Sequence, residues 1–166
     1  MSEVQKFSIL YDAAEDRLAW DAEYKDGATT RMWLTQRLCR AMVDAIVPML
    51  KPSAAQEVLR EHQTTMQSWE QAAAMSDFGK VPAVQTQPQT VVGLVKTVNI
   101  KPEDGKLVLS FDFGAVGPCV IIVNAQQLRQ TLSVIHGLYA AAAWPRDFWP
   151  AWIADPSAAP RSDIVN

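Results

Sequence analysis

The sequence predicts an α+β fold made of two pseudo-repeated strand–strand–strand–helix units that form antiparallel sheet, with an additional outer helix between them. Apolar side chains occupy every second position in several short segments of both halves, which is the period of a half-buried strand. In each half these segments lead into a capping residue and an apolar pattern of helical period. Residues 14–38 also align with residues 102–128 when two one-residue gaps are allowed, which indicates an internal duplication.

The first unit is expected to span residues 1–75 together with the outer helix. The Asp26-Gly27 pair between its second and third strands indicates a hairpin, because Gly tolerates the positive φ of such turns. Thr35 is the predicted N-cap of its helix, and Ser53 the predicted cap of the outer helix. The strands and helices of this unit are predicted at residues 5–12, 17–24, 29–34, 35–50 and 53–75.

The second unit is expected to span residues 91–152, after a linker at 76–90 that is rich in proline and glutamine. Asn124 is its predicted N-cap, and residues 153–166 are predicted to be a disordered tail. The segment 119–123 is apolar on both faces, so it is predicted to lie centrally in the sheet or at a subunit contact. The elements of this unit are predicted at residues 91–101, 106–113, 119–123 and 124–143.

Composition restricts the classes of function that the chain can have. The chain has 166 residues, a net charge of −3 and two cysteines, which are expected to be buried, reduced thiols. The acidic balance disfavours a nucleic-acid partner, since phosphate binding normally requires a basic face. No apolar run is long enough to cross a bilayer, and the first residues have no signal-peptide core, so we expect a cytoplasmic protein without a membrane partner.

Residues that could carry catalysis are scarce. His62 and His136 are the two histidines, and neither follows a pattern typical of a nucleophile or metal site. Acidic pairs occur at residues 15–16 and 103–104, where turn chemistry explains them better than general acid–base catalysis. We therefore expect no cofactor, no metal and no enzymatic activity.

Arginines cluster where the third predicted strand enters the first helix. Free amides and the helix dipole favour negative charge at a helix start. This cluster therefore predicts a site for an anion or an acidic partner, although arginines beside an apolar helix face are also typical of a solvated surface. The candidate residues are Arg31, Thr35, Arg37 and Arg40.

Aromatic residues follow the last helix on a proline-rich segment. Such side chains either cover the chain's own core or anchor a binding interface, and the sequence leaves both alternatives open. The candidate interface consists of Trp144, Phe148, Trp149 and Trp152, together with Ile121 in the apolar strand.

The order of predicted elements resembles the tandem sheet-plus-helix repeats of whirly-type and PUR single-stranded nucleic-acid binders. The resemblance implies nucleic-acid or phosphate binding, but Asp21, Glu23 and Asp112 occupy strand faces where such proteins need basic and aromatic side chains. The leading hypothesis is therefore a non-enzymatic interaction or assembly module that forms a homodimer or binds another protein. The alternative is a nucleic-acid or phosphate-ligand binder that uses the arginine cluster.

Overall fold

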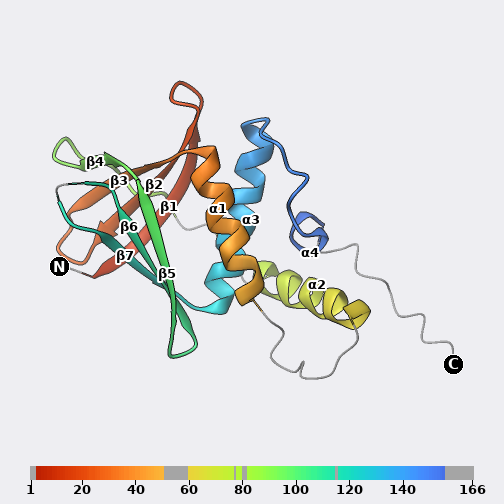
Figure 1. Ribbon diagram of the computed structural model, residues 1–166. Coiled ribbons are helices and arrows are strands. Elements are labelled where there is room, and N and C mark those ends of the chain that lie inside the picture. The colour runs from red at the N-terminus through yellow and green to blue at the C-terminus, as the bar shows by residue number, and fades with distance from the viewer. Residues whose placement is uncertain (1–2, 51–59, 77, 80–81, 115, 156–166) are drawn as a thin grey trace, which may run out of the picture.

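The computed structural model describes residues 3–50, 60–76, 78–79, 82–114 and 116–155, and its fold is α+β (Figure 1). Two sheets lie on one side of the molecule, helices α1 and α3 cover them, and α2 and α4 lie farther out. The strands are β1 (Val4–Asp12), β2 (Arg17–Tyr24), β3 (Thr29–Leu34), β4 (Val91–Leu94), β5 (Thr97–Glu103), β6 (Lys106–Asp112) and β7 (Cys119–Val123). The helices are α1 (Gln36–Ile46), η1 (Val47–Met49), α2 (Arg60–Ser76), α3 (Ala125–Ala141) and α4 (Ala151–Ala154).

The four-stranded sheet has the order β1-β2-β3-β4, and the three-stranded sheet has the order β5-β6-β7. All neighbouring strands are antiparallel except β3 and β4, which are parallel. The element order strand–strand–strand–helix thus occurs twice, in β1-β2-β3-α1 and in β5-β6-β7-α3. A common origin of the two units stays a prediction.

The predicted strand at 91–101 is two strands that belong to different sheets, so the expectation of a single strand was wrong. The Val95 amide donates to the Trp33 carbonyl at 2.9 Å, at the edge of the four-stranded sheet. The next amide, that of Lys96, donates to the Asp112 carbonyl at 2.8 Å in the three-stranded sheet. The chain therefore crosses between the sheets within two residues, and the linker expected at 76–90 leads into a strand of the first unit's sheet.

The core lies between the inner faces of the two sheets and the helices. Alternation places Leu18 and Trp20 inward from β2, and Leu109 and Phe111 inward from β6, and all four are buried. The rings of Trp20 and Phe111 meet with their centroids 5.0 Å apart. The two sheets therefore share one hydrophobic core.

The predicted caps Thr35 and Asn124 are confirmed, whereas Ser53, the third predicted cap, lies outside the described residues. Thr35 Oγ1 accepts a hydrogen bond from the Leu38 amide at 3.3 Å, and Asn124 Oδ1 accepts one from the Gln127 amide at 2.8 Å. Counted from these caps, the buried Leu128 of α3 corresponds to the buried Cys39 of α1, and Leu38 is only half-buried. The predicted alignment of residues 14–38 with residues 102–128 places Leu38 on Leu128, so in the two helices it is displaced by one residue. The helices also meet directly, because the Tyr139 hydroxyl donates to the Gln36 carbonyl at 3.2 Å.

Helix α2 packs on α3 through polar side chains, although the sequence predicted only that it lies outside. Gln71 is fully buried, and its Nε2 donates to the Arg129 carbonyl at 2.9 Å and to Ser133 Oγ at 2.7 Å. The buried Arg129 guanidinium pairs with Glu70 and lies over the Trp152 ring at 5.2 Å. The part of the predicted outer helix at 53–59 lies outside the described residues.

Gly93 of β4 lies close against Phe113, the residue that follows β6. A Cβ atom at this position would lie 2.6 Å from Phe113 Cδ2 and 2.9 Å from the Phe113 carbonyl oxygen. We expect Gly93→Ala to destabilise the fold by about 1–3 kcal/mol, since backbone and a packed ring must both shift. Chemical denaturation would measure this change in the free energy of unfolding.

Gly137→Ala is the matched control. A Cβ atom at position 137 meets nothing within 4 Å, and the residue lies in α3. Replacing an exposed helical glycine by alanine is expected to stabilise the fold by about 0.5–1 kcal/mol. A Gly93→Ala protein as stable as the original would contradict the close packing of β4 against Phe113.

Candidate functional site

Arg31, the first residue of the predicted anion site, is engaged by an acid of the neighbouring strand. Arg31 and Asp21 are directly opposite in the β2–β3 register. The guanidinium donates a hydrogen bond from Nε to Asp21 Oδ1 at 2.7 Å and another from Nη2 to Asp21 Oδ2 at 2.8 Å. It also lies over the Trp33 ring, 5.4 Å from the ring centroid. The hydrogen bond to Asp21 raises the pKa of Arg31 further above its ordinary value. This bidentate pair satisfies both ions locally.

Asp21 is completely buried, which corrects the expectation that it lies on an exposed polar strand face. The linker lies beside it: the Val84 amide donates to Ser8 Oγ at 3.0 Å, and Ser8 is directly opposite Asp21 in the β1–β2 register. Val84 is itself buried, and the Lys6 ammonium donates to the Ala83 carbonyl at 3.2 Å. Residues 83 and 84 therefore pack on the outer face of the four-stranded sheet.

The other predicted anion-site residues lie on or beside α1. Thr35 uses its hydroxyl to cap the helix, and Arg37 has an exposed side chain. Arg40 forms an ion pair with Asp44 at 3.9 Å and lies over the Phe148 ring at 4.7 Å. Arg31 and Arg40 thus each have an acidic partner of their own, so the described contacts do not direct these arginines to one ligand.

The aromatic segment lies against the chain's own helices. Of the two alternatives for these side chains, this arrangement is the one in which they cover the chain's own core. Trp144, Trp149 and Trp152 are buried, and Phe148 is half-buried. Tyr139 of α3 is at the centre of the cluster, with ring centroids 5.0–5.6 Å from those of Trp144, Phe148 and Trp149. Trp144 Nε1 also donates to Asp16 Oδ1 at 2.9 Å, which ties the segment to the β1–β2 turn. Ile153 is buried in α4, so the predicted disordered tail cannot begin there.

Strand β7 is at the end of its sheet, so its predicted central position is wrong. Its neighbour is β6, and among the described residues no strand pairs with its other side. Ile121, the predicted interface residue, faces Leu109 in the register and is buried in the core. The side chain of Ile122 points the other way and is 53% exposed. Because side chains alternate along a strand, the exposed apolar residue is one position later than predicted.

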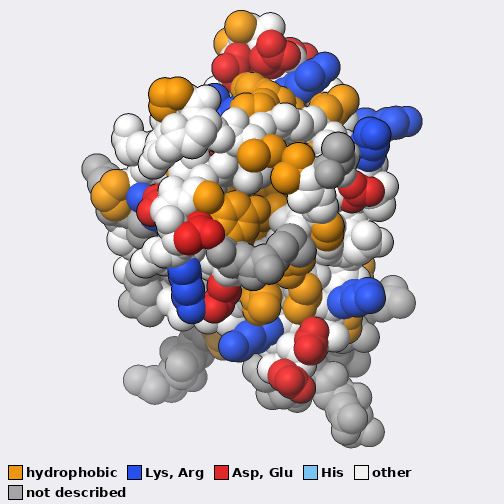
Figure 2. All heavy atoms as spheres, turned by 90° about the vertical axis from the view of Figure 1, so that its left-hand side faces the viewer, with side chains coloured by type: hydrophobic (Ala, Val, Ile, Leu, Met, Phe, Trp, Pro, Cys, Tyr) orange, Lys and Arg blue, Asp and Glu red, His pale blue; other side chains and the backbone are white. Residues whose placement is uncertain are grey.

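The outer face of the three-stranded sheet carries aliphatic side chains beside this free edge. Val108 is directly opposite Ile122 in the β6–β7 register, and Val120 lies on the same face. Val108 and Val120 are half-buried. Hydrophobic side chains also gather in the middle of the face that bears the sheets, with charged side chains around them (Figure 2). An apolar edge strand of this kind is a template for pairing with another chain.

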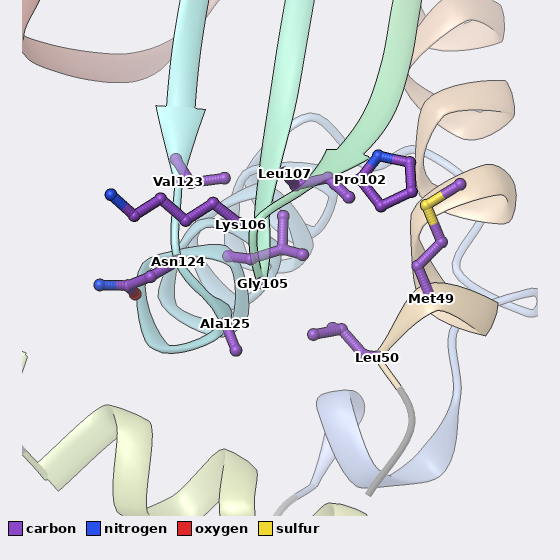
Figure 3. A pocket seen from close by; sticks show the side chains of 10 residues that line it. Met49, Leu50, Pro102, Gly105, Lys106, Leu107, Val123, Asn124 and Ala125 are labelled. Carbon is purple, nitrogen blue, oxygen red and sulfur yellow. The ribbon is translucent and has the colours of Figure 1, made fainter. Parts of the chain in front are cut away.

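A small cavity of about 180 Å³ lies where the β5–β6 turn approaches the start of α3 (Figure 3). Met49, Leu50 and Leu107 make its lining largely apolar, while Lys106 and Asn124 lie at its edge. The Asn124 side chain already caps α3, so it has no acceptor atom dedicated to a ligand. We therefore interpret the cavity as a packing gap between these elements and do not assign a ligand to it.

The described residues contain little reactive chemistry. Burial raises the pKa of Cys39 to about 12 and also raises the pKa of Cys119, so both buried thiols stay protonated and weakly nucleophilic. Burial lowers the pKa of His136, whose ring packs edge-on against Trp149 with centroids 5.2 Å apart. Within the described ranges, no group of three His, Cys, Asp or Glu residues could hold a metal ion.

Sequence reasoning missed two features: the outward-facing residues Val120 and Ile122 of β7, and the Asp21–Arg31 ion pair. Alternation in residues 106–113 already indicated that Leu107, Leu109 and Phe111 face inward. A register between β6 and β7 was needed to show which residues of β7 face outward, and the sequence provides no direct signal for it. Within the described part of the chain, no helix is long and apolar enough to cross a membrane.

No family model, curated protein or solved structure matches this chain.

Proposed function

We propose that the protein is a non-enzymatic assembly module that forms a homodimer through the β7 side of its three-stranded sheet. The observation that supports this most directly is the free apolar edge of β7, whose residues Cys-Val-Ile-Ile-Val include neither a charge nor a proline. Natural proteins usually protect edge strands with lysine, proline, a bulge or a covering element. An edge that carries neither lysine nor proline and pairs with no further described strand, beside the exposed Ile122, favours a partner at this position.

The opposite edge of the same sheet, strand β5, differs from β7 in its residue types. Strand β5 contains Lys101 and Pro102, two residue types that discourage strand pairing at an edge. The protected β5 and the unprotected β7 support an assembly that uses one edge of the sheet. A second copy of this chain is the partner that we propose, because a two-fold interface brings the same apolar patch to both sides.

The nucleic-acid alternative has less support. Across the described strands β5–β7, the outer face carries no aromatic side chain on which a base could stack. Its lysines, Lys101 and Lys106, are balanced by Glu103 and Asp112. Arg31 and Arg40 of the predicted anion site each have an acidic and an aromatic partner within the chain.

Sedimentation velocity over a range of protein concentrations tests the proposed homodimer. The edge of a five-residue strand is a small interface, so we expect a dissociation constant in the micromolar range. This corresponds to a free energy of association of about 8 kcal/mol. Ile122→Lys should weaken dimerisation at least about tenfold, because the two-fold places a lysine on each side of the apolar contact.

Val92→Lys is the matched control for this experiment. Val92 is 57% exposed, close to the 53% of Ile122, and it lies on β4 at the edge of the other sheet. The control variant should dimerise like the original protein. A chain that stays monomeric at all concentrations, or a dimer that Ile122→Lys leaves intact, would overturn the proposed function.

A further inference from the structure

The turn between β5 and β6 determines which backbone groups of β7 point away from the sheet. Asp104 and Gly105 both have positive φ angles, 48° and 73°, which is the geometry of a two-residue type I′ hairpin. In such a hairpin the residues that close the turn, Glu103 and Lys106, exchange both hydrogen bonds. The N–H and C=O groups along β6 then alternate, so those of Leu107, Leu109 and Phe111 point toward β7.

Two observations agree with this assignment. The Asp112 carbonyl accepts the Lys96 amide, so it points toward the β5 side as the alternation requires. Pro102, which has no N–H group, is at a position of β5 whose backbone faces away from β6, where a proline loses no ladder hydrogen bond.

The same alternation extends to β7. Cys119, Ile121 and Val123 are opposite the β6 residues whose backbone groups point toward β7. Their own N–H and C=O groups therefore bond within the sheet, while those of Val120 and Ile122 point outward along the free edge. Within β7, an incoming strand can therefore hydrogen bond only to Val120 and Ile122.

We propose that β7 of a second copy pairs antiparallel with this edge, with the two-fold axis at Ile121. This inference rests on the proposed homodimer and specifies its contact. Val120 then exchanges two hydrogen bonds with Ile122 of the partner subunit, and Ile122 exchanges two with Val120 of the partner subunit. The two three-stranded sheets become one continuous six-stranded sheet across the dimer.

The two neighbouring registers would form fewer hydrogen bonds than this one. With the axis at Val120, Ile122 would be opposite Pro118 of the partner subunit, which has no N–H to donate. With the axis at Ile122, Val120 would be opposite Asn124 of the partner subunit, whose N–H already donates to Gln127 Oε1 at 3.0 Å. The register centred on Ile121 is the one that uses all four outward N–H and C=O groups of each edge.

Side chains are compatible with the same register. On the outer face, Ile122 would lie beside Val120 of the partner subunit, and the Val108–Ile122 pair would extend into a continuous aliphatic band. Aliphatic cross-strand pairs of this kind stabilise antiparallel sheets, and no like charges meet because β7 contains no charged residue. On the inner face the two Ile121 side chains would meet next to the cores of both subunits.

Amide hydrogen exchange of the full-length protein, followed by NMR at low and high concentration, tests the pairing. The Val120 and Ile122 amides should become about tenfold more protected at a hundredfold excess over the dissociation constant, where most chains are dimeric. The Ile121 amide, bonded within the sheet in both states, should show no comparable concentration dependence. In Ile122→Lys, protection at Val120 should not rise with concentration.

A second variant separates backbone pairing from packing of the aliphatic face. Val120→Pro removes one outward N–H but no hydrogen bond to β6, so the subunit fold should persist while dimerisation weakens at least about tenfold. If the protein dimerises but protection at Val120 and Ile122 is independent of concentration, the edge pairing is overturned and the homodimer stands. A protein that never dimerises overturns both.

Discussion

A chain that ends before Trp144 should lose its cooperative unfolding transition. Removing residues 144–166 deletes three buried tryptophans, and each Trp→Ala replacement in a core typically costs about 3–5 kcal/mol. Together these losses approach or exceed the usual free energy of unfolding of a domain, which is about 5–15 kcal/mol. The deletion also strips the rings packed around Tyr139, leaving a large apolar surface on α3 exposed.

Thermal unfolding followed by near-ultraviolet circular dichroism would measure this loss. A chain that ends at Asp155 keeps every described contact of the aromatic segment and serves as the control. A chain truncated before Trp144 that unfolds cooperatively, within a few degrees of the control, would contradict the covering role. If truncation left the subunit stable and abolished dimerisation, the aromatic segment would be the interface in place of β7.

Arg31→Ala should destabilise the fold by about 3–5 kcal/mol. The substitution leaves the Asp21 carboxylate, 1% exposed, without the guanidinium that satisfies both of its oxygens. An uncompensated buried charge costs far more than the loss of a surface ion pair. At about 2–4 °C per kcal/mol for a chain of this size, the melting temperature should fall by at least about 6 °C.

Two further variants distinguish the buried pair from a general effect of removing arginine. Arg17→Ala disrupts the more exposed Arg17–Glu15 pair, whose closest atoms are 3.6 Å apart, and should cost less than about 1 kcal/mol. Asp21→Asn combined with Arg31→Ala removes both charges and should recover part of the loss, since no buried ion remains unpaired. An Arg31→Ala protein as stable as Arg17→Ala would show that Asp21 has another source of compensation.

Local signals in the sequence were sufficient for the strands, turns and caps of each unit. Alternation in residues 17–24 and 106–113 identified which side chains face the core. Hydroxyl and amide side chains at Thr35 and Asn124 identified the helix starts, because these groups satisfy free amides within three residues along the chain. Both depend on neighbours in sequence, which is why they were accessible without a structure.

Features that depend on distant residues were not accessible in this way. The parallel pairing of β3 with β4 joins the two units, and the hydrogen bond from the Val84 amide to Ser8, next to Asp21, joins the linker to the first unit. Nothing local to Asp21 distinguishes a buried acid from a solvated one, and alternation alone suggested solvent. The free edge of β7 likewise follows from strand order, which an apolar pentapeptide does not encode.

The sharing of one core by both halves has a consequence for synthesis on the ribosome. The Trp20 ring emerges early, but Phe111, which packs against it, and the amides of Val95 and Lys96, which join the two sheets, emerge much later. At about 5–20 residues per second, the nascent first half remains incomplete for several seconds. During that interval we expect it to expose an apolar sheet face and an unpaired β3 edge, features that chaperones of nascent chains bind.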